Sequence, residues 1–265
     1  RIEVVRGATG LTTGAGDPSA TINMVRKRPT AQWQANAGVS GGSHDNYYSS
    51  LDVGGPLAFD GRLRGRAVFA YRDSQSFRDN YALQREVGYA ILEGDLTDDT
   101  VLAVGFDYQN KHVQGTSWGP LPYWNSSGGK AKQPRSANMA AHWSSWPLKD
   151  ENTFATLDHR LGRDWRLKAA YTRRESDTDG KVYYGGEGFP NSDRSGMTAW
   201  NNHMIGTSKM DVVEFNLAGS YSLLGRDHEL MVGYGESEQQ DASPHVRDGE
   251  VPGNYNDIND WKYMG

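Results

Sequence analysis

Apolar and polar residues alternate one by one over long stretches of this sequence, and this pattern limits the fold more than any other feature. In residues 213–223 the odd positions hold Val, Phe, Leu, Gly, Tyr and Leu, while the even positions between them are mostly polar. Successive side chains of a β-strand point to opposite faces, so this stretch predicts a strand with one apolar and one polar face. The same alternation, strong or weak, recurs in residues 32–40, 47–57, 62–72, 86–96, 102–109, 153–161, 165–172 and 228–236. The sequence therefore predicts an all-β protein.

The connections between the predicted strands alternate between tight turns and long segments. Tight turns rich in Gly and Asp are expected at residues 60–61, 97–100, 162–164 and 225–227. Long loops are expected at residues 73–85, 109–152, 175–211 and 237–265. Short turns at one end and long loops at the other are the layout of a transmembrane antiparallel β-barrel. Most of the predicted strands also approach the ~9–11 residues that a tilted, membrane-spanning strand needs.

Aromatic residues mark both ends of the predicted strands. Trp33 and Trp165 open strands at the end with the tight turns. Four tyrosines are each the last outward-facing residue before a long segment: Tyr71, Tyr108, Tyr171 and Tyr234. Two rings of amphipathic aromatics are typical of a barrel at its two membrane interfaces. The alternative is that these rings cap the core of a soluble sheet.

Arginine indicates which face of the strands points away from lipid. Arg62, Arg64, Arg66 and Arg72 share one face of one predicted strand. At the middle of a bilayer each would cost ~2–4 kcal/mol if it faced lipid. They are therefore expected to face the lumen of the barrel, where acidic groups could pair with them.

Composition excludes several other classes of protein. Only 36% of the residues are hydrophobic, and no run approaches the ~18 apolar residues of a membrane-spanning helix. The net charge of -5 does not favour nucleic-acid binding, and the lack of cysteine excludes disulfides and thiol catalysis. The seven histidines are scattered, and no catalytic or metal-binding constellation can be recognised. We therefore expect neither an enzyme nor a metal site.

The first thirty residues follow a different pattern. Two short apolar stretches, 2–5 and 21–26, flank a segment with four glycines and a proline. The sequence from Ile2 to Gly7 and from Pro18 to Pro29 resembles the C-terminal part of the plug domain of TonB-dependent siderophore receptors. The resemblance is to the ferric-coprogen, ferripyoverdine and ferrioxamine receptor type, and it extends more loosely over the strands that follow.

This resemblance implies a domain organisation. Residues 1–30 would be the C-terminal part of a plug domain, and residues 31–265 the N-terminal portion of an outer-membrane β-barrel. Receptors of this kind have 22 strands, of which about nine would be present here. The TonB box and the front of the plug would lie outside this sequence.

The resemblance also implies a function. The protein would bind a ferric siderophore at the extracellular face of the bacterial outer membrane and import it with energy supplied by TonB. Its partners would be the ferric siderophore, TonB and outer-membrane lipid. No cofactor is expected, because the chelator itself holds the iron. Two alternatives stay open at this point: a passive porin-like channel and a soluble carbohydrate-binding β domain.

Aromatic residues are frequent in the predicted external loops. Rigid aromatic rings beside polar groups are what a ligand site on loops uses. The resemblance implies ligand contacts for five of them, Trp118, Tyr123, Trp124, Trp143 and Trp146, and for Leu11 and Thr13 at the expected plug apex. The alternative is that the loop aromatics only pack the loops together.

Overall fold

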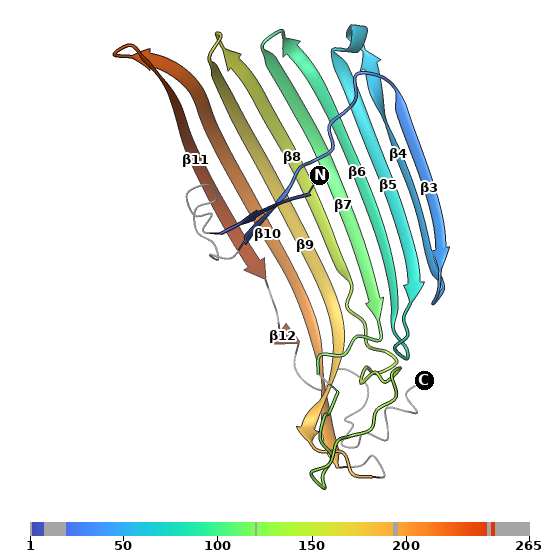
Figure 1. Ribbon diagram of the computed structural model, residues 1–265. Coiled ribbons are helices and arrows are strands. Elements are labelled where there is room, and N and C mark those ends of the chain that lie inside the picture. The colour runs from blue at the N-terminus through green and yellow to red at the C-terminus, as the bar shows by residue number, and fades with distance from the viewer. Residues whose placement is uncertain (1, 8–19, 120, 193–195, 243–244, 247–265) are drawn as a thin grey trace.

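The computed structural model describes residues 2–7, 20–119, 121–192, 196–242 and 245–246, and within them β-strands dominate (Figure 1). A short hairpin-like pair comes first, β1 (Ile2–Arg6) with β2 (Ala20–Met24). The main strands are β3 (Gln34–Gly42), β4 (Asn46–Ala58), β5 (Leu63–Gln75), β6 (Ala82–Thr97), β7 (Thr100–Gln114), β8 (Leu148–Leu161), β9 (Trp165–Gly188), β10 (Met197–Leu223) and β11 (Arg226–Ala242). A 3-10 turn, η1 (Phe59–Gly61), joins β4 to β5, and β12 (His245–Val246) pairs with β10.

The main strands form one antiparallel wall in sequence order. Each strand from β4 to β10 pairs with the strand before and after it, and the wall is open, with β3 and β11 as its outermost strands. Figure 1 shows the strands tilted side by side, with the β4–β5, β6–β7, β8–β9 and β10–β11 turns at one end and the short β3–β4 turn at the other. The prediction of an all-β, barrel-type sheet is confirmed. No helix in the described part of the chain is long and apolar enough to cross a membrane.

Register separates the two faces of this wall as the alternation predicts. Directly paired residues of an antiparallel ladder place their side chains on the same face. Phe69 pairs with Leu51 on one side and Gly88 on the other, in an outward row, and 52% of Phe69 stays exposed. Leu167 and Leu217 pair with each other farther along the wall, and neither is buried. Among the described residues no second protein layer covers this apolar face, as expected for a surface in contact with hydrocarbon.

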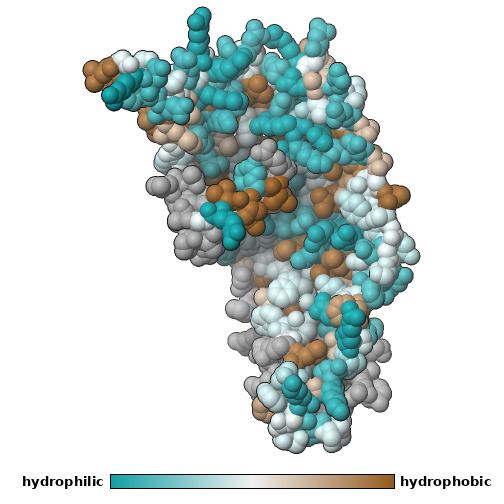
Figure 2. Space-filling view, in the orientation of Figure 1, coloured by the Kyte–Doolittle hydropathy of each residue, from teal (hydrophilic) through white to brown (hydrophobic). Residues whose placement is uncertain are grey.

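At the end of the wall where most tight turns lie, two tryptophans pack closely against glycines. At the end with the tight turns, hydrophilic side chains crowd the surface shown in Figure 2. Two tryptophans at this end each lie on a glycine of the neighbouring strand. A Cβ at Gly55 would come within 2.6 Å of Trp33, and one at Gly219 within 2.3 Å of Trp165. Only glycine leaves room for these rings, so the close approach is part of how the wall is built there.

At the other end of the wall several strands are longer, and the loops correspondingly shorter, than the sequence predicts. The prediction that 175–211 is a long loop is wrong, because β9 and β10 continue through most of it and leave only 189–196 between them. The predicted loops at 73–85 and 237–265 begin too early for the same reason, since β5 reaches Gln75 and β11 reaches Ala242. Outside the apolar band both faces of a strand are polar, so the alternation that reveals strands disappears while the backbone ladder continues. Figure 1 shows β9 and β10 running beyond the other strands.

A strap of residues 25–33 leads from β2 to β3 across the polar face of the wall. The guanidinium of Arg26 lies 4.0 Å from the ring centroid of Phe154, which is only 2% exposed. Phe154 forms a small buried cluster with Ile91 and Ala103, and Tyr89 packs against it. The buried core of the wall therefore lies on the face that the strap crosses, opposite to the lipid-facing side.

Candidate ligand-binding site

The segment between β7 and β8, residues 115–147, folds back onto the extended part of β9. The backbone N–H of Trp118 donates to the carbonyl of Tyr183 at 3.1 Å. Ser145 and Lys181 exchange two backbone hydrogen bonds of 2.8 Å each. Because these bonds resemble a strand ladder, they fix the segment beside β9 in one register.

A buried asparagine ties this segment to a second loop. The side-chain amide of Asn138 donates to the carbonyl of Asp79 at 2.8 Å and to that of Gly115 at 2.9 Å. The backbone N–H of Asp79 in turn donates to the carbonyl of Ser136. Asn138 is 4% exposed, so these carbonyls have little access to water. The β5–β6 and β7–β8 connections and the end of β9 thus form one unit at the end of the wall that the sequence predicts to be external, and we call it the extracellular unit.

The predicted aromatic residues come together in pairs within this unit. Trp118 meets Trp146 edge to face, with ring centroids 6.5 Å apart, and Trp143 meets Tyr183 in the same way at 6.2 Å. Tyr123 and Trp124 contact each other at 5.0 Å. Offset and edge-to-face pairs of this kind hold rings rigidly at little cost in side-chain entropy. The first two pairs are neighbours, because both lie against residues 181–183 of β9.

Exposure divides these aromatics into two groups. Trp118, Tyr123 and Trp124 are exposed, whereas Trp143 and Trp146 are partly buried. The indole Nε1 of Trp143 is buried and has no hydrogen-bond partner among the described residues. The two inner tryptophans therefore support the unit, and the outer three rings present a surface to which a ligand has access.

Two predicted site residues, Leu11 and Thr13, lie outside the described residues. The structure adds Tyr183, which is 1% exposed and whose ring packs against Trp143. Its position in a strand was hidden from the sequence, because apolar and polar residues no longer alternate in this part of β9. Asn138 was also missed, since one asparagine in a polar segment carries no signal of burial.

The polar face of the wall carries ion pairs between the strap and the strands. The carboxylate of Asp52 accepts hydrogen bonds from Lys27 at 2.6 Å and from Arg66 at 2.8 Å. Glu93 pairs in the same way with Arg28 at 2.8 Å and with Arg64 at 3.1 Å. Each carboxylate therefore joins one cation of the strap to one cation of the wall. The expectation that the arginines of β5 face away from lipid agrees with these contacts.

Backbone carbonyls of the strap accept two further bonds from the wall. Arg66 donates to the carbonyl of Arg28 at 2.9 Å, and the hydroxyl of Tyr89 donates to the carbonyl of Lys27 at 2.6 Å. A chain segment without its own ladder needs such partners when it lies against protein. The strap is therefore held by both charge and backbone hydrogen bonds.

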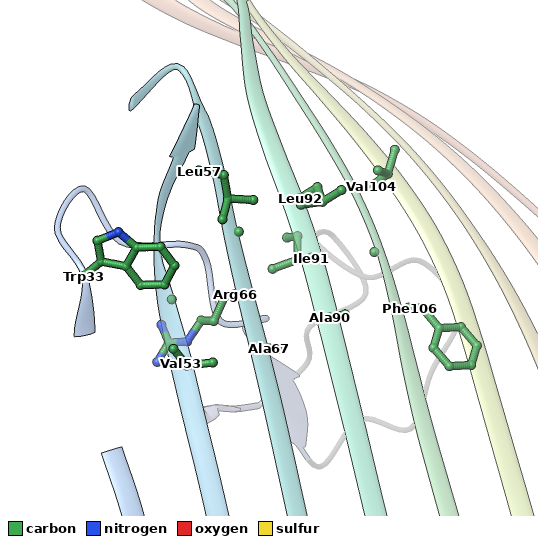
Figure 3. Close-up of a pocket in the computed structure, with 13 residues that line it drawn as sticks. Trp33, Val53, Leu57, Arg66, Ala67, Ala90, Ile91, Leu92, Val104 and Phe106 are labelled. Carbon is green, nitrogen blue, oxygen red and sulfur yellow. The ribbon is translucent and has the colours of Figure 1, made fainter. Parts of the chain in front are cut away.

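An apolar groove lies elsewhere, on the lipid-facing side of β4 to β7. It has a volume of about 520 Å³ and is lined by apolar side chains that include Trp33, Leu57, Leu92 and Phe106 (Figure 3). Gly65 forms part of its floor, where a Cβ would come within 2.8 Å of Leu57. Because it opens toward hydrocarbon and offers almost no polar groups, this groove is not the place for a polar ligand.

No cluster of His, Asp and Glu within the described residues could hold a metal ion. The described part of the candidate site is thus an aromatic surface above a charged wall.

Known proteins provide a comparison for this architecture. No protein-family model matches the chain. It is 41% identical to the ferripyoverdine receptor of Pseudomonas aeruginosa over 234 residues, which cover 88% of this chain and 29% of that protein. It is 37% identical to the ferric-pyoverdine BN7/BN8 receptor of Pseudomonas putida over 244 residues, which cover 92% of this chain and 30% of that protein.

A solved structure agrees with these sequence relatives. The chain superimposes on the ferripyoverdine receptor of the outer membrane of Pseudomonas aeruginosa bound to ferripyoverdine, with a TM-score of 0.89 and 37% identity. The match covers 97% of this chain and 34% of that one, so this chain spans about a third of the length of the relatives it matches. These relatives are receptors rather than enzymes and lie in the outer membrane, as the sequence predicts. The homologues of this chain are TonB-dependent siderophore receptors, and its sheet has the fold of their outer-membrane barrel.

Proposed function

We propose that this protein is an outer-membrane receptor that binds a ferric siderophore of the pyoverdine class and imports it with energy supplied by TonB. The observation that carries the proposal is the aromatic extracellular unit, which lies on the wall of a chain that is similar to ferripyoverdine receptors. Residues 1–30 would be the end of a plug domain and residues 31–265 part of the barrel. TonB would act on a part of the plug outside this sequence.

The proposed function requires the site to bind an organic ligand and not to catalyse a reaction. A ferric siderophore presents an organic shell around the iron, so the protein has to recognise the shell and not the metal. Exposed rings of Trp118 and Trp124 can stack on planar parts of the chelator, while nearby backbone and side-chain groups supply hydrogen bonds. The chelator itself would supply all ligands to the iron, and no cofactor would be needed.

Import requires that ligand binding alter the balance between two states of the plug. A ligand shifts such a balance only by its difference in affinity for the two states. The strap is the described segment best placed to carry this change, because Lys27 and Arg28 join it to Asp52 and Glu93 of the wall.

A passive porin-like channel is the rival function. It would share the barrel wall, but it has no use for a separate segment that is ion-paired across the lumen face at Asp52 and Glu93. A soluble carbohydrate-binding domain would need a second layer over Phe69 and its neighbours, and the described residues provide none.

The proposal can be tested with the full-length protein in a strain that lacks other receptors for ferric siderophores. Growth under iron limitation on a panel of ferric chelators should be restored by ferripyoverdine. Trp118→Ala and Trp124→Ala should each raise the Kd for ferripyoverdine about tenfold, because each removes a stacking ring. Trp33→Ala is the matched control, since this ring faces lipid at the opposite end. Unchanged titrations for both loop variants would refute the assignment of the site.

A further inference from the structure

Three cations lie side by side on the lumen face of the wall, near its extracellular end. Arg72 of β5 pairs in register with Arg85 of β6, and Arg85 pairs with Lys111 of β7. Directly opposed residues have Cβ atoms only about 4.5–5.5 Å apart, and like charges in such positions are destabilising. This cation row therefore has an unfavourable electrostatic energy unless an anion lies beside it.

The row faces the lumen and not the lipid. Arg72 lies six residues after Arg66 in β5, so the two side chains share one face of the strand. Arg66 binds Asp52 and the strap on that face. Tyr71, the residue before Arg72, belongs to the outward face and to the extracellular aromatic girdle. Any anion that reaches the row must therefore come through the extracellular mouth or from the plug, because membrane lipid has no access to this face.

Arg72 and Arg85 form no ion pair with a described carboxylate, and Lys111 has only a longer-range electrostatic attraction to Asp150. No carboxylate lies within ion-pair distance of Arg72, Arg85 or Lys111 in the part of the chain that the structure describes, although Arg72 does approach the ring of Tyr48 at 5.6 Å. The Nε of Arg85 is buried and lacks a hydrogen-bond acceptor there. A buried guanidinium donor without an acceptor is costly, and a carboxylate oxygen would satisfy it.

The nearest carboxylate on this face is already engaged. Asp150 pairs in register with Gln109, two residues from Lys111. Its Oδ1 accepts a hydrogen bond from Arg174 at 2.7 Å and another from Ser176. Beneath the strap, by contrast, Arg66 pairs with Asp52 and Arg64 pairs with Glu93.

We infer that Arg72, Arg85 and Lys111 form a binding site for an anionic group, and that this group is a free carboxylate on the ferric chelator. The inference rests on the proposed function and adds a substrate class to it: chelators that carry negative charge outside the iron-binding atoms. The guanidinium of Arg85 would donate to the carboxylate, and the flanking Arg72 and Lys111 would supply further charge. The aromatic unit would bind the rest of the ligand.

The test uses two probes that differ only in charge. Ferripyoverdine with a free carboxylate and the same compound with that carboxylate amidated are titrated against the full-length protein. The wild type should bind the carboxylate form more tightly. The double variant Arg72→Gln and Arg85→Gln should raise the Kd for the carboxylate form about tenfold and leave that for the amide within about twofold. Raised salt should weaken wild-type binding of the carboxylate form only.

Controls separate this inference from structural damage and from the proposed function. Lys132→Gln removes an exposed cation of the β7–β8 segment and should change neither Kd. Equal wild-type affinity for the two probes, or equal weakening of both in the double variant, would overturn the inference while leaving a receptor that binds ferric chelator. If the wild type binds neither probe, the proposed function fails, and this inference fails with it.

Discussion

The lumen face beneath the strap and the extracellular unit are built on the same antiparallel wall, but different forces hold them. Beneath the strap, contacts between distant segments are ion pairs, such as Lys27 with Asp52 and Arg28 with Glu93. In the extracellular unit, backbone hydrogen bonds and edge-to-face rings join residues 115–147 to β9. Partly buried ion pairs thus hold the strap, whereas backbone hydrogen bonds and ring contacts hold the extracellular unit.

This difference agrees with the two tasks of the proposed function. Import would require a contact that can be released as a unit, and charge pairs between polar surfaces can exchange partners for water. A ligand surface needs rings fixed in position before the ligand arrives, because each ring ordered on binding would subtract from affinity. The two regions should therefore respond differently to substitution.

The largest effect is expected from the wall carboxylate that serves both strap and strand. Asp52→Ala leaves Lys27 and Arg66 without their shared partner, and Arg66 is largely buried. Breaking such a pair on one side should lower the free energy of unfolding by about 3 kcal/mol. Urea unfolding of the full-length protein, followed by tryptophan fluorescence, measures this loss.

A matched control makes the result specific. Asp98→Ala breaks the pair with Arg62 at the turn end, where the side chain of Asp98 is 85% exposed. Exposed pairs contribute about 0–1 kcal/mol, so the midpoint should hardly move. Equal losses in the free energy of unfolding for the two variants would show that burial beneath the strap does not strengthen the Asp52 ion pairs.

A second, intermediate effect is expected where an aromatic ring occupies the space above a glycine of the wall. Gly105 pairs with Phe154, and a Cβ there would lie 2.3 Å from the ring and 2.8 Å from the carbonyl of Ala90. Gly105→Ala should therefore cost about 2 kcal/mol, since neither the ring nor the backbone can move away freely. Gly94→Ala is the control, because its Cβ would meet only Leu63 at 3.9 Å. The same midpoint in urea for both variants would show that the wall can make room for a methyl group beside Phe154.

The smallest effect on the whole protein is expected in the extracellular unit. Asn138→Ala removes the hydrogen bond that joins the β7–β8 connection to Asp79 of the β5–β6 connection, and a second bond to Gly115 within the β7–β8 connection itself. The loss of about 1–2 kcal/mol should appear as local opening and not as global unfolding, because the wall does not depend on these loops. Hydrogen exchange of residues 115–147 should accelerate, while exchange in β5 and β6 should stay unchanged. Faster exchange throughout the wall would contradict the separation of the two regions.

Much of the fold could be predicted from the sequence. The alternation around Phe69, Leu167 and Leu217 identified the strands and their lipid-facing side. The four predicted tight turns lie where the structure has them, although the short β3–β4 turn at 43–45 was not predicted. The aromatic character of the 118–146 segment also directed attention to the unit that now forms the candidate site. These features are local, because side chains two residues apart share a face of a strand whatever the rest of the chain does.

The ends of the long strands and the contacts between distant residues could not be predicted from the alternation of residues. β9 and β10 continue beyond the apolar band, where both of their faces are polar, so the sequence suggested a loop at 175–211. Tyr183 and Asn138 showed no sign of burial, since another segment covers them. Backbone hydrogen bonds between strands leave no mark on residue type.

The sequence alone thus determined that this chain forms a sheet with one face for lipid and one for charge. The period of two residues is imposed by strand geometry, and the cost of a charge in hydrocarbon determines which face is which. Only the tertiary structure decided that Arg28 meets Glu93, that Trp143 meets Tyr183, and that Arg72, Arg85 and Lys111 lie in one row. Such partners depend on strand register and on how long connections fold back, which are properties of the whole chain and not of any short segment.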